Sequence, residues 1–445
     1  MNQESLTLIG PFRQLLTMNG MPLHGSITDE SLEIVSEAGI LVEGSLIKAV
    51  GPWQDLQDAH PHSPTWELAG DYVGLPGWID VHTHICFAGS RANDYAARTA
   101  GNTYLEIAKA GGGIWNSVQH TRQAAAETLA ALTLSRANRH LQEGVTTIEV
   151  KSGYGLSLEA ELKMLRAIQQ ANQQTAADLI PTCLAAHTLP RDFSGGKAAY
   201  LQRLVEELFP QLKAEQLSSR IDIFTEEEAF TVEESRTYLR AAQAAGFELT
   251  VHADQFHAGG GQLAIEMGAA SADHLEASKM ADIEAFAQSS TVAVVLPGAS
   301  LGLGLPFAPA RQLLDAGACL AIASDWNPGS APMGNLLLQA SLMGAQQKLR
   351  TSEVFAGLTV RAAKALNLKD RGILAPGLLA DFLAFPSGDF QEILYQQGNL
   401  RPEFVWKKGQ LAGGPGVTKE RMHGVRDNRR VERLNLQHLS TSNGE

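Results

Sequence analysis

The segment DVHTH at residues 80–84 is the clearest place for chemistry, because it directly follows the apolar run GWI. Side chains alternate between the two faces of a β-strand, so His82 and His84 point in the same direction. Two imidazoles on one face at a strand end can chelate a single divalent metal ion. A second pair, His60 and His62, lies in a loop containing Pro and Ser, and we interpret it as a surface feature.

Three more polar residues directly follow apolar runs further along the chain. His252 follows FELTV, His274 follows ASAD, and Asp325 follows CLAIAS. A single buried histidine is often only a core residue with one backbone partner. Four strand ends that each carry His or Asp are harder to explain in this way, and together they predict one shared metal site.

These residues need a scaffold that gathers distant strand ends. The sequence alternates short apolar runs with longer helical patterns, for example over 158–170, 232–245 and 308–315. Eight such βα units predict an α/β fold, the TIM (β/α)8 barrel, whose active site lies at the carboxyl ends of the strands. The predicted strands are 77–81, 145–150, 179–185, 221–224, 248–252, 270–273, 291–296 and 319–324.

Further strand patterns lie outside this alternation, at both ends of the chain. Residues 39–51 contain two apolar runs around a Glu43-Gly44 turn, which is typical of a hairpin. Residues 377–385 and 403–409 are also strand-like. We therefore predict a small β-sandwich domain built from both ends. The predicted boundaries are 1–75 and 369–412 for the two parts of this domain, 76–368 for the barrel, and 413–445 for a polar tail.

The composition excludes some classes of function. The chain has 445 residues, of which 44% are hydrophobic, enough to bury a large core. Its 48 acidic and 35 basic residues give a formal net charge of −13. A chain this acidic repels phosphate backbones, so we do not expect a nucleic acid partner.

Cysteine usage and hydropathy indicate the compartment. Cys86, Cys183 and Cys319 are odd in number and far apart, which argues against a disulfide framework and against a zinc ribbon. No apolar stretch approaches the length of a membrane span, and residues 1–13 lack a signal-peptide pattern. We therefore expect a cytoplasmic protein with no membrane partner.

Longer motifs surround the candidate metal residues. They are PGWIDVHTH (76–84), HICFAGSR (84–91), AGGGI (110–114), TTIEVKSGYGL (146–156), AAH (185–187), HADQF (252–256), SADHLE (271–276) and SDWNPGS (324–330). Through them the chain, from about residue 39 to 409, resembles the amidohydrolase superfamily and, within it, the imidazolonepropionase family. The resemblance implies hydrolysis of the ring amide of 4-imidazolone-5-propanoate to N-formimino-L-glutamate in histidine degradation. It also implies a homodimer, and one Zn or Fe ion held by His82, His84, His252 and Asp325.

The resemblance further implies which residues contact the small-molecule substrate. Arg91 has the planar fork that suits a propanoate carboxylate, whereas Gln255 cannot titrate and so cannot be the base. We expect His274 to be the general base, Asp325 to ligate the metal and accept a proton, and His187 to lie near the developing oxyanion. The implied substrate contacts are Arg91, Tyr154, His187, Gln255, Asn327, Gly329 and Ser330.

Departures from the family pattern leave alternatives open. The family shows Cys-Glu-x-Gly-Val-Phe where this chain has TEEEAF at 225–230, and Asp94-Tyr95 replaces an acid-Phe pair. A related amidohydrolase or deaminase acting on another small heterocycle is one alternative, and a catalytically inactive metal-binding protein is another. Lys151 follows an apolar strand and offers a carboxylated bridge between two metal ions, although its SGYGL context matches the single-metal family.

Overall fold

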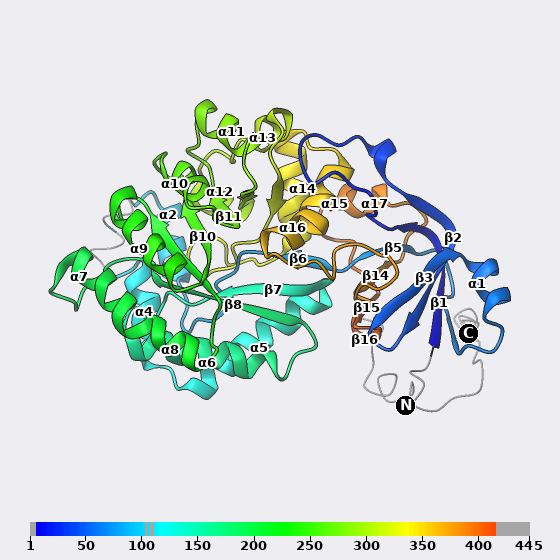
Figure 1. The fold of residues 1–445 in the computed structure, drawn as a ribbon, viewed down its shortest axis with the longest axis horizontal. Helices are drawn as coiled ribbons and strands as arrows, with labels where there is room; N and C mark the ends of the chain where they lie inside the picture. The colour runs from blue at the N-terminus through cyan, green and yellow to red at the C-terminus, as the bar shows by residue number, and fades with distance from the viewer. Residues whose placement is uncertain (1–5, 103–105, 107–110, 415–445) are drawn as a thin grey trace, which may run out of the picture.

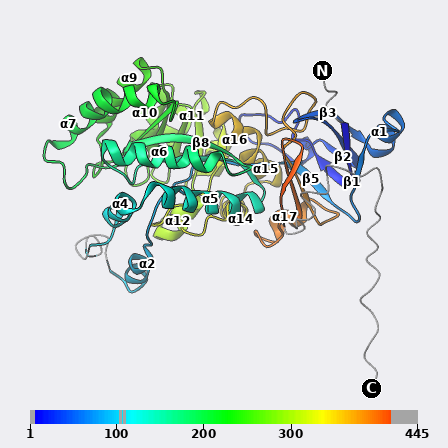
Figure 2. The same ribbon diagram turned by 90° about the horizontal axis from the view of Figure 1, so that it is seen from below.

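A computed structural model of the chain describes residues 6–102, 106 and 111–414. It contains two eight-stranded sheets, which form two domains side by side (Figures 1 and 2). The predicted polar tail lies outside the described residues apart from Gly413 and Gly414. Within the described ranges, no helix is both long enough and apolar enough to cross a bilayer.

The larger domain is the predicted parallel barrel. Its strands follow the order β13-β12-β11-β10-β9-β8-β7-β6, and each predicted strand overlaps one of them. The barrel closes just beyond the strand ends, where the Asp325 N–H donates to the His82 carbonyl at 3.0 Å and the His84 N–H donates to the Trp326 carbonyl at 2.9 Å. The strands are β6 Trp78–Asp80, β7 Val145–Lys151, β8 Asp178–Ala186, β9 Arg220–Thr225, β10 Glu248–Ala253, β11 Ser271–His274, β12 Val292–Val295 and β13 Leu320–Ile322.

Helices surround the barrel and bury their apolar faces against it. Helix α6, Leu158–Asn172, begins where the Ser157 side chain accepts the Ala160 N–H, and it buries Leu162, Leu165 and Ile168. The other helices of this domain include α2 Ala92–Thr99, α4 Ile114–Gln123, α5 Ala126–Gln142, α7 Gly196–Arg203, α8 Phe209–Ala214, α9 Val232–Ala244, α10 Gly260–Glu266, α11 Met280–Ala287, α12 Pro297–Leu303, α13 Ala310–Ala316, α14 Leu336–Gln347, α15 Thr351–Leu358 and α16 Val360–Ala365.

The smaller domain combines both ends of the described chain, as predicted. Its strands form one continuous mixed sheet in the order β16-β15-β14-β5-β1-β2-β3, with β4 also paired to β1. Phe382 and Trp406 stack in its core with ring centroids 4.6 Å apart. Its elements are β1 Leu6–Leu16, β2 Ile34–Glu43, β3 Leu46–Pro52, α1 Trp53–Ala59, β4 Thr65–Glu67, β5 Val73–Pro76, β14 Phe382–Phe385, α17 Gln391–Tyr395, β15 Phe404–Lys407 and β16 Gln410–Gly413.

Aromatic contacts join the two domains. Trp78 of β6 stacks on Phe355 with centroids 5.7 Å apart and also meets Phe385 of β14 at 6.1 Å. The residue numbers predicted for the domain boundaries stay a prediction. The three cysteines are buried and free, as expected from their spacing.

Candidate active site

Four ligand atoms from three parts of the chain converge at the carboxyl end of the barrel. His84 Nε2 lies 3.2 Å from His82 Nε2 and 3.3 Å from His252 Nε2. Asp325 Oδ1 lies 3.6 Å from His82 Nε2 and 3.5 Å from His84 Nε2. Four ligands placed tetrahedrally at about 2.0–2.1 Å from a Zn ion would be about 3.3–3.4 Å apart. The spacing of these atoms therefore matches a single tetrahedral cation.

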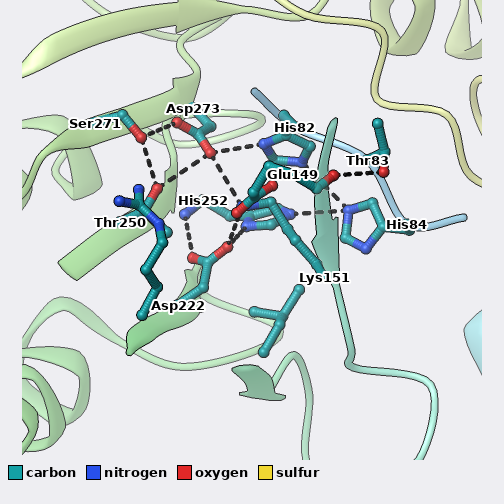
Figure 3. Close-up of polar contacts among 12 residues, drawn as sticks. His82, Thr83, His84, Glu149, Lys151, Asp222, Thr250, His252, Ser271 and Asp273 are labelled. Carbon is teal, nitrogen blue, oxygen red and sulfur yellow. Dashed lines mark hydrogen bonds and ion pairs between the residues drawn. The ribbon is translucent and has the colours of Figure 1, made fainter. Parts of the chain in front are cut away.

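Buried carboxylates set the orientation of two of these imidazoles (Figure 3). His82 Nδ1 lies 2.6 Å from Asp273 Oδ2, and His252 Nδ1 lies 2.8 Å from Asp222 Oδ2. Each carboxylate can accept a hydrogen bond from the Nδ1–H group, and this tautomer leaves the Nε2 lone pair free for a metal.

The same imidazoles are held in the neutral form that a metal needs. Burial chiefly lowers the pKa of His82 and of His84, and it lowers the pKa of His252 to about 4. Neutral imidazoles whose lone pairs face one another at 3.2–3.3 Å repel unless a cation lies between them. The ligand set of His82, His84 and His252 thus fits a divalent metal ion.

The strand ends at this site carry unusual backbone conformations. His274, Leu275 and Asp325 have φ values of 89°, 71° and 47°, a region that residues other than glycine rarely adopt. Such strain persists where surrounding structure enforces it, and it is concentrated at functional sites. Here it turns the chain sharply out of β11 and past β13, so that two polar side chains are directed to the barrel mouth.

A cavity of about 160 Å³ opens above the ligand atoms. It is bounded by His84, His252, His274 and Asp325 and by apolar side chains such as Phe224. All seven substrate contacts expected from the sequence also line it: Arg91, Tyr154, His187, Gln255, Asn327, Gly329 and Ser330. The structure thus brings residues from all eight motifs quoted above to one small space next to the candidate metal site.

His274 has the surroundings of a proton carrier. Its ring lies 5.6 Å from that of His82 and 5.3 Å from that of His252, and its Nδ1 is 3.6 Å from Glu276 Oε2. Burial opposes the charged form, but Glu276 and Asp325 raise the pKa of His274 above its ordinary value. A buried imidazole that holds a proton beside carboxylates is suited to accept and release one near neutral pH.

His187 and Tyr154 form one wall of the cavity. His187 Nδ1 lies 3.0 Å from the Gly153 carbonyl, and burial lowers the pKa of this imidazole to about 4. Neutral His187 therefore donates its proton to the backbone and presents Nε2 as an acceptor, whereas only the imidazolium could donate to an oxyanion. Tyr154 is 3% exposed, and burial raises its pKa, so it stays a neutral donor.

Comparison with known proteins identifies the family. Residues 107–412 match the amidohydrolase family, and residues 38–62 match the imidazolonepropionase-like composite domain of bacteria. Imidazolonepropionase of Deinococcus radiodurans is 45% identical over 91% of this chain and 99% of its own length. Imidazolonepropionase of Deinococcus deserti is 43% identical over 91% of this chain and 98% of its own length. The chain belongs to the imidazolonepropionase family.

Solved structures with much lower identity share the fold. An atrazine chlorohydrolase from Arthrobacter aurescens, complexed with zinc, has a TM-score of 0.65 at 18% identity over 94% of this chain and 98% of its own. An adenosine deaminase from Xanthomonas campestris, with bound zinc, has a TM-score of 0.66 at 15% identity, over 95% of this chain and 97% of its own. At this identity the likeness concerns the barrel architecture alone.

Sequence reasoning missed the polar layer next to the candidate metal ligands of this imidazolonepropionase-family chain (Figure 3). Lys151 Nζ lies 2.8 Å from Glu149 Oε1, 2.9 Å from Asp222 Oδ2 and 3.5 Å from Asp273 Oδ2. Two of these carboxylates are the partners of His252 and His82. A signal was present in the sequence, because Glu149 and Lys151 alternate within the apolar strand TTIEVK and so must face the barrel interior.

The contacts of Lys151 also bear on the bridging alternative. Burial alone would favour the neutral amine, but the three carboxylates raise the pKa of Lys151 above its ordinary value. A protonated ammonium has no lone pair with which to carry a carboxyl group. Lys151 therefore acts as a cation that holds carboxylates together, and this form of the side chain cannot be a carboxylated bridge between two metal ions.

The segment TEEEAF at residues 225–230, which departs from the family pattern, contacts the loop that follows β10. Glu226 is buried and accepts the N–H groups of Phe256 at 2.8 Å and of His257 at 3.3 Å, next to the cavity residue Gln255. Glu227 and Glu228 have side chains that are 76% and 77% exposed, and neither is among the described residues that line the cavity. Glu227 and Glu228 thus do not contribute side chains to the described lining of the cavity.

Gly329 gives a direct test of substrate positioning. A Cβ at this position would overlap Nη1 of Arg91. We expect Gly329→Ala to displace the guanidinium and to raise the KM for a carboxylate substrate roughly tenfold, because small misplacements at a binding site are costly. Metal content should be unchanged. Steady-state kinetics and a metal count check this, with Gly51→Ala as the control, since a Cβ there has no heavy atom within 4 Å.

Proposed function

We propose that this protein hydrolyses the ring amide of 4-imidazolone-5-propanoate to N-formimino-L-glutamate in histidine degradation. The observation that carries the proposal is the convergence of a tetrahedral ligand set and all seven family contact positions on one cavity. The identity of 43–45% to imidazolonepropionases over nearly their full length supports the same substrate.

We further propose that one Zn or Fe ion is held by His82, His84, His252 and Asp325. Imidazole and carboxylate ligands suit both metals. A divalent ion bound there supplies Lewis acidity and lowers the pKa of a water molecule toward about 7. Asp222 and Asp273 orient the ligands through their Nδ1 atoms, as carboxylates commonly do for metal-bound histidines.

The residues of the chain carry the remaining steps. Arg91 binds the propanoate, and His187 Nε2 accepts a hydrogen bond from the substrate ring N–H. In its neutral form, His274 takes a proton from the attacking water and delivers it to the ring nitrogen when the C–N bond breaks. The water oxygen then becomes part of the new carboxyl group, one water proton becomes the N–H, and the other is released to solvent when the carboxyl group ionises. Tyr154 donates to the developing oxyanion, a role for which the neutral form of His187 lacks a proton.

Metal binding should depend on the protonation of Asp325. Burial raises its pKa to about 6, whereas the imidazole ligands are already neutral at that pH. A proton on the carboxylate competes with the metal, so the apparent metal affinity should fall about tenfold per pH unit below pH 6 and level off above it. Competition with a chromogenic chelator from pH 5 to 8 measures this. A flat profile between pH 5 and 6 would contradict it, and Asp325→Asn should remove the slope.

The activity test uses the protein loaded with Zn or with Fe. Freshly made 4-imidazolone-5-propanoate should lose its imidazolone absorbance, with about one metal ion bound per chain. If the protein turned over other cyclic amides or heterocycles but not 4-imidazolone-5-propanoate, the result would favour a related amidohydrolase or deaminase. Absence of both metal and turnover after reconstitution would favour an inactive protein. A homodimer stays an expectation from family likeness, and sedimentation velocity tests it.

A further inference from the structure

The cavity contains a second guanidinium that the sequence patterns did not single out. Arg98 lies in the last turn of α2, and Arg91 is the N-cap residue of the same helix. A spacing of seven residues is close to two helical turns, so both side chains leave the same face of α2. Both line the cavity above the ligand atoms.

The two arginines differ in how their charge is balanced. Arg91 Nε donates to Asp94 Oδ2 at 2.8 Å, and both side chains are largely buried. Arg98 has no acidic partner within 4.0 Å among the described residues, and its one described hydrogen bond, from Nη1 to the Gly302 carbonyl at 2.5 Å, is to a neutral group. Arg98 is therefore the lining arginine that has no acidic side chain in direct contact among the described residues, and Asp94 acts on it only from a longer distance.

The Gly302 contact also fixes where this charge lies. Helix α12, which carries Gly302, packs so closely on the cavity turn that a Cβ at Gly302 would overlap the Ser330 carbonyl. Its next residue, Leu303, lines the cavity. The Arg98 guanidinium is thus anchored at the rim beside Ser330, and burial and the nearby charge of Arg91 lower its pKa. An anion bound between the two guanidiniums would favour their charged forms, and it would therefore oppose both the effect of burial and the repulsion between the two charges.

We propose that Arg98 is a second carboxylate-binding residue, which holds the terminal carboxylate of the substrate together with Arg91. The proposal rests on the proposed function for the identity of the substrate. Arg98 has five N–H donors, of which the described contacts use one, so the others can bond a carboxylate. Arg91 alone offers less attraction to an anion, because Asp94 already neutralises it.

Binding of two stable probes tests this without turnover. The probes are 3-(imidazol-4-yl)propanoate and the corresponding neutral propanamide, titrated calorimetrically into the metal-loaded protein. The original chain should prefer the carboxylate. Arg98→Gln should weaken carboxylate binding roughly tenfold, as expected for loss of a charge-assisted hydrogen bond, and should change amide binding less than about twofold. Arg98→Lys should recover part of the loss, because it restores the charge but lacks the fork.

The control is Arg240→Gln, which removes the same charge from an exposed position on α9 with a side chain 65% exposed. It should change neither affinity. Equal weakening of both probes in Arg98→Gln would mean that Arg98 only anchors α12 and would overturn the proposal. Unchanged carboxylate binding, or an original chain that does not prefer the carboxylate, would overturn it as well. Failure of the proposed function shows separately, as absent turnover of the imidazolone.

Discussion

Replacing His252 by alanine should deprive the protein of its metal, whereas replacing His274 by alanine should leave the metal bound and remove most turnover. His252 Nε2 is one of the converging ligand atoms, and its Nδ1 is held by Asp222. His274 lies beside this group, and its Nδ1 faces Glu276 instead. Loss of a general acid–base group typically lowers kcat by about 10²–10⁴-fold. Metal analysis after gel filtration and steady-state kinetics measure the two effects.

The comparison needs a histidine variant that touches neither function. His62→Ala is suitable, because His62 is exposed in the second His-x-His segment, and it should keep both metal and activity. Equal loss of metal from His252→Ala and His274→Ala would show that His274 is a ligand. Full turnover in His274→Ala would assign the proton transfer to Asp325 alone.

Replacing Lys151 by methionine should strongly destabilise the barrel. The substitution would leave Glu149, Asp222 and Asp273 buried close together without a cation, and unpaired buried charges cost about 3–5 kcal/mol. Asp222 and Asp273 would also orient their histidines less firmly, so metal affinity should fall roughly 10–100-fold. Chemical denaturation of the metal-free protein and chelator competition measure the two losses.

The pH dependence of this loss follows from the same charges. Without Lys151 the buried carboxylates should have pKa values above those of the unfolded chain, as burial already raises the pKa of Glu149 to about 7. The folded variant then binds protons more readily than the unfolded chain, so its stability should rise as the pH falls from 7 toward 5. Adding Glu149→Gln to Lys151→Met should recover part of the stability, because it removes a carboxylate that supports no histidine.

An exposed lysine provides the comparison for this series. Lys48 has a side chain 55% exposed, and Lys48→Met should change the free energy of unfolding by no more than about 0.5 kcal/mol. If Lys151→Met were as stable as Lys48→Met at pH 7, the three carboxylates would not depend on Lys151. That result would contradict a stabilising role of Lys151 in the polar layer.

Sequence patterns were enough to predict the alternation of strands and helices, the hairpin around Gly44, and the residues at the strand ends. These features are local, since periodicity along a few residues decides which side chains share a face. Eight such units predicted the barrel, and the strand patterns at both ends of the chain predicted the second domain. His82, His84, His252 and Asp325 were recognisable because a polar residue after an apolar run is a local signal.

Which of these groups contact one another depends on how the strands and helices pack together. Asp273 of β11 bonds His82 beyond β6, and Lys151 of β7 joins Asp222 of β9, because barrel closure places strands far apart in the sequence around one interior. Arg98 lies at the cavity because α2 contacts α12 through the Gly302 carbonyl. Glu226 likewise accepts a backbone N–H from Phe256, a residue distant in the sequence. No local pattern encodes such pairings, since they depend on the relative positions of whole elements, and those positions follow from packing across the entire core.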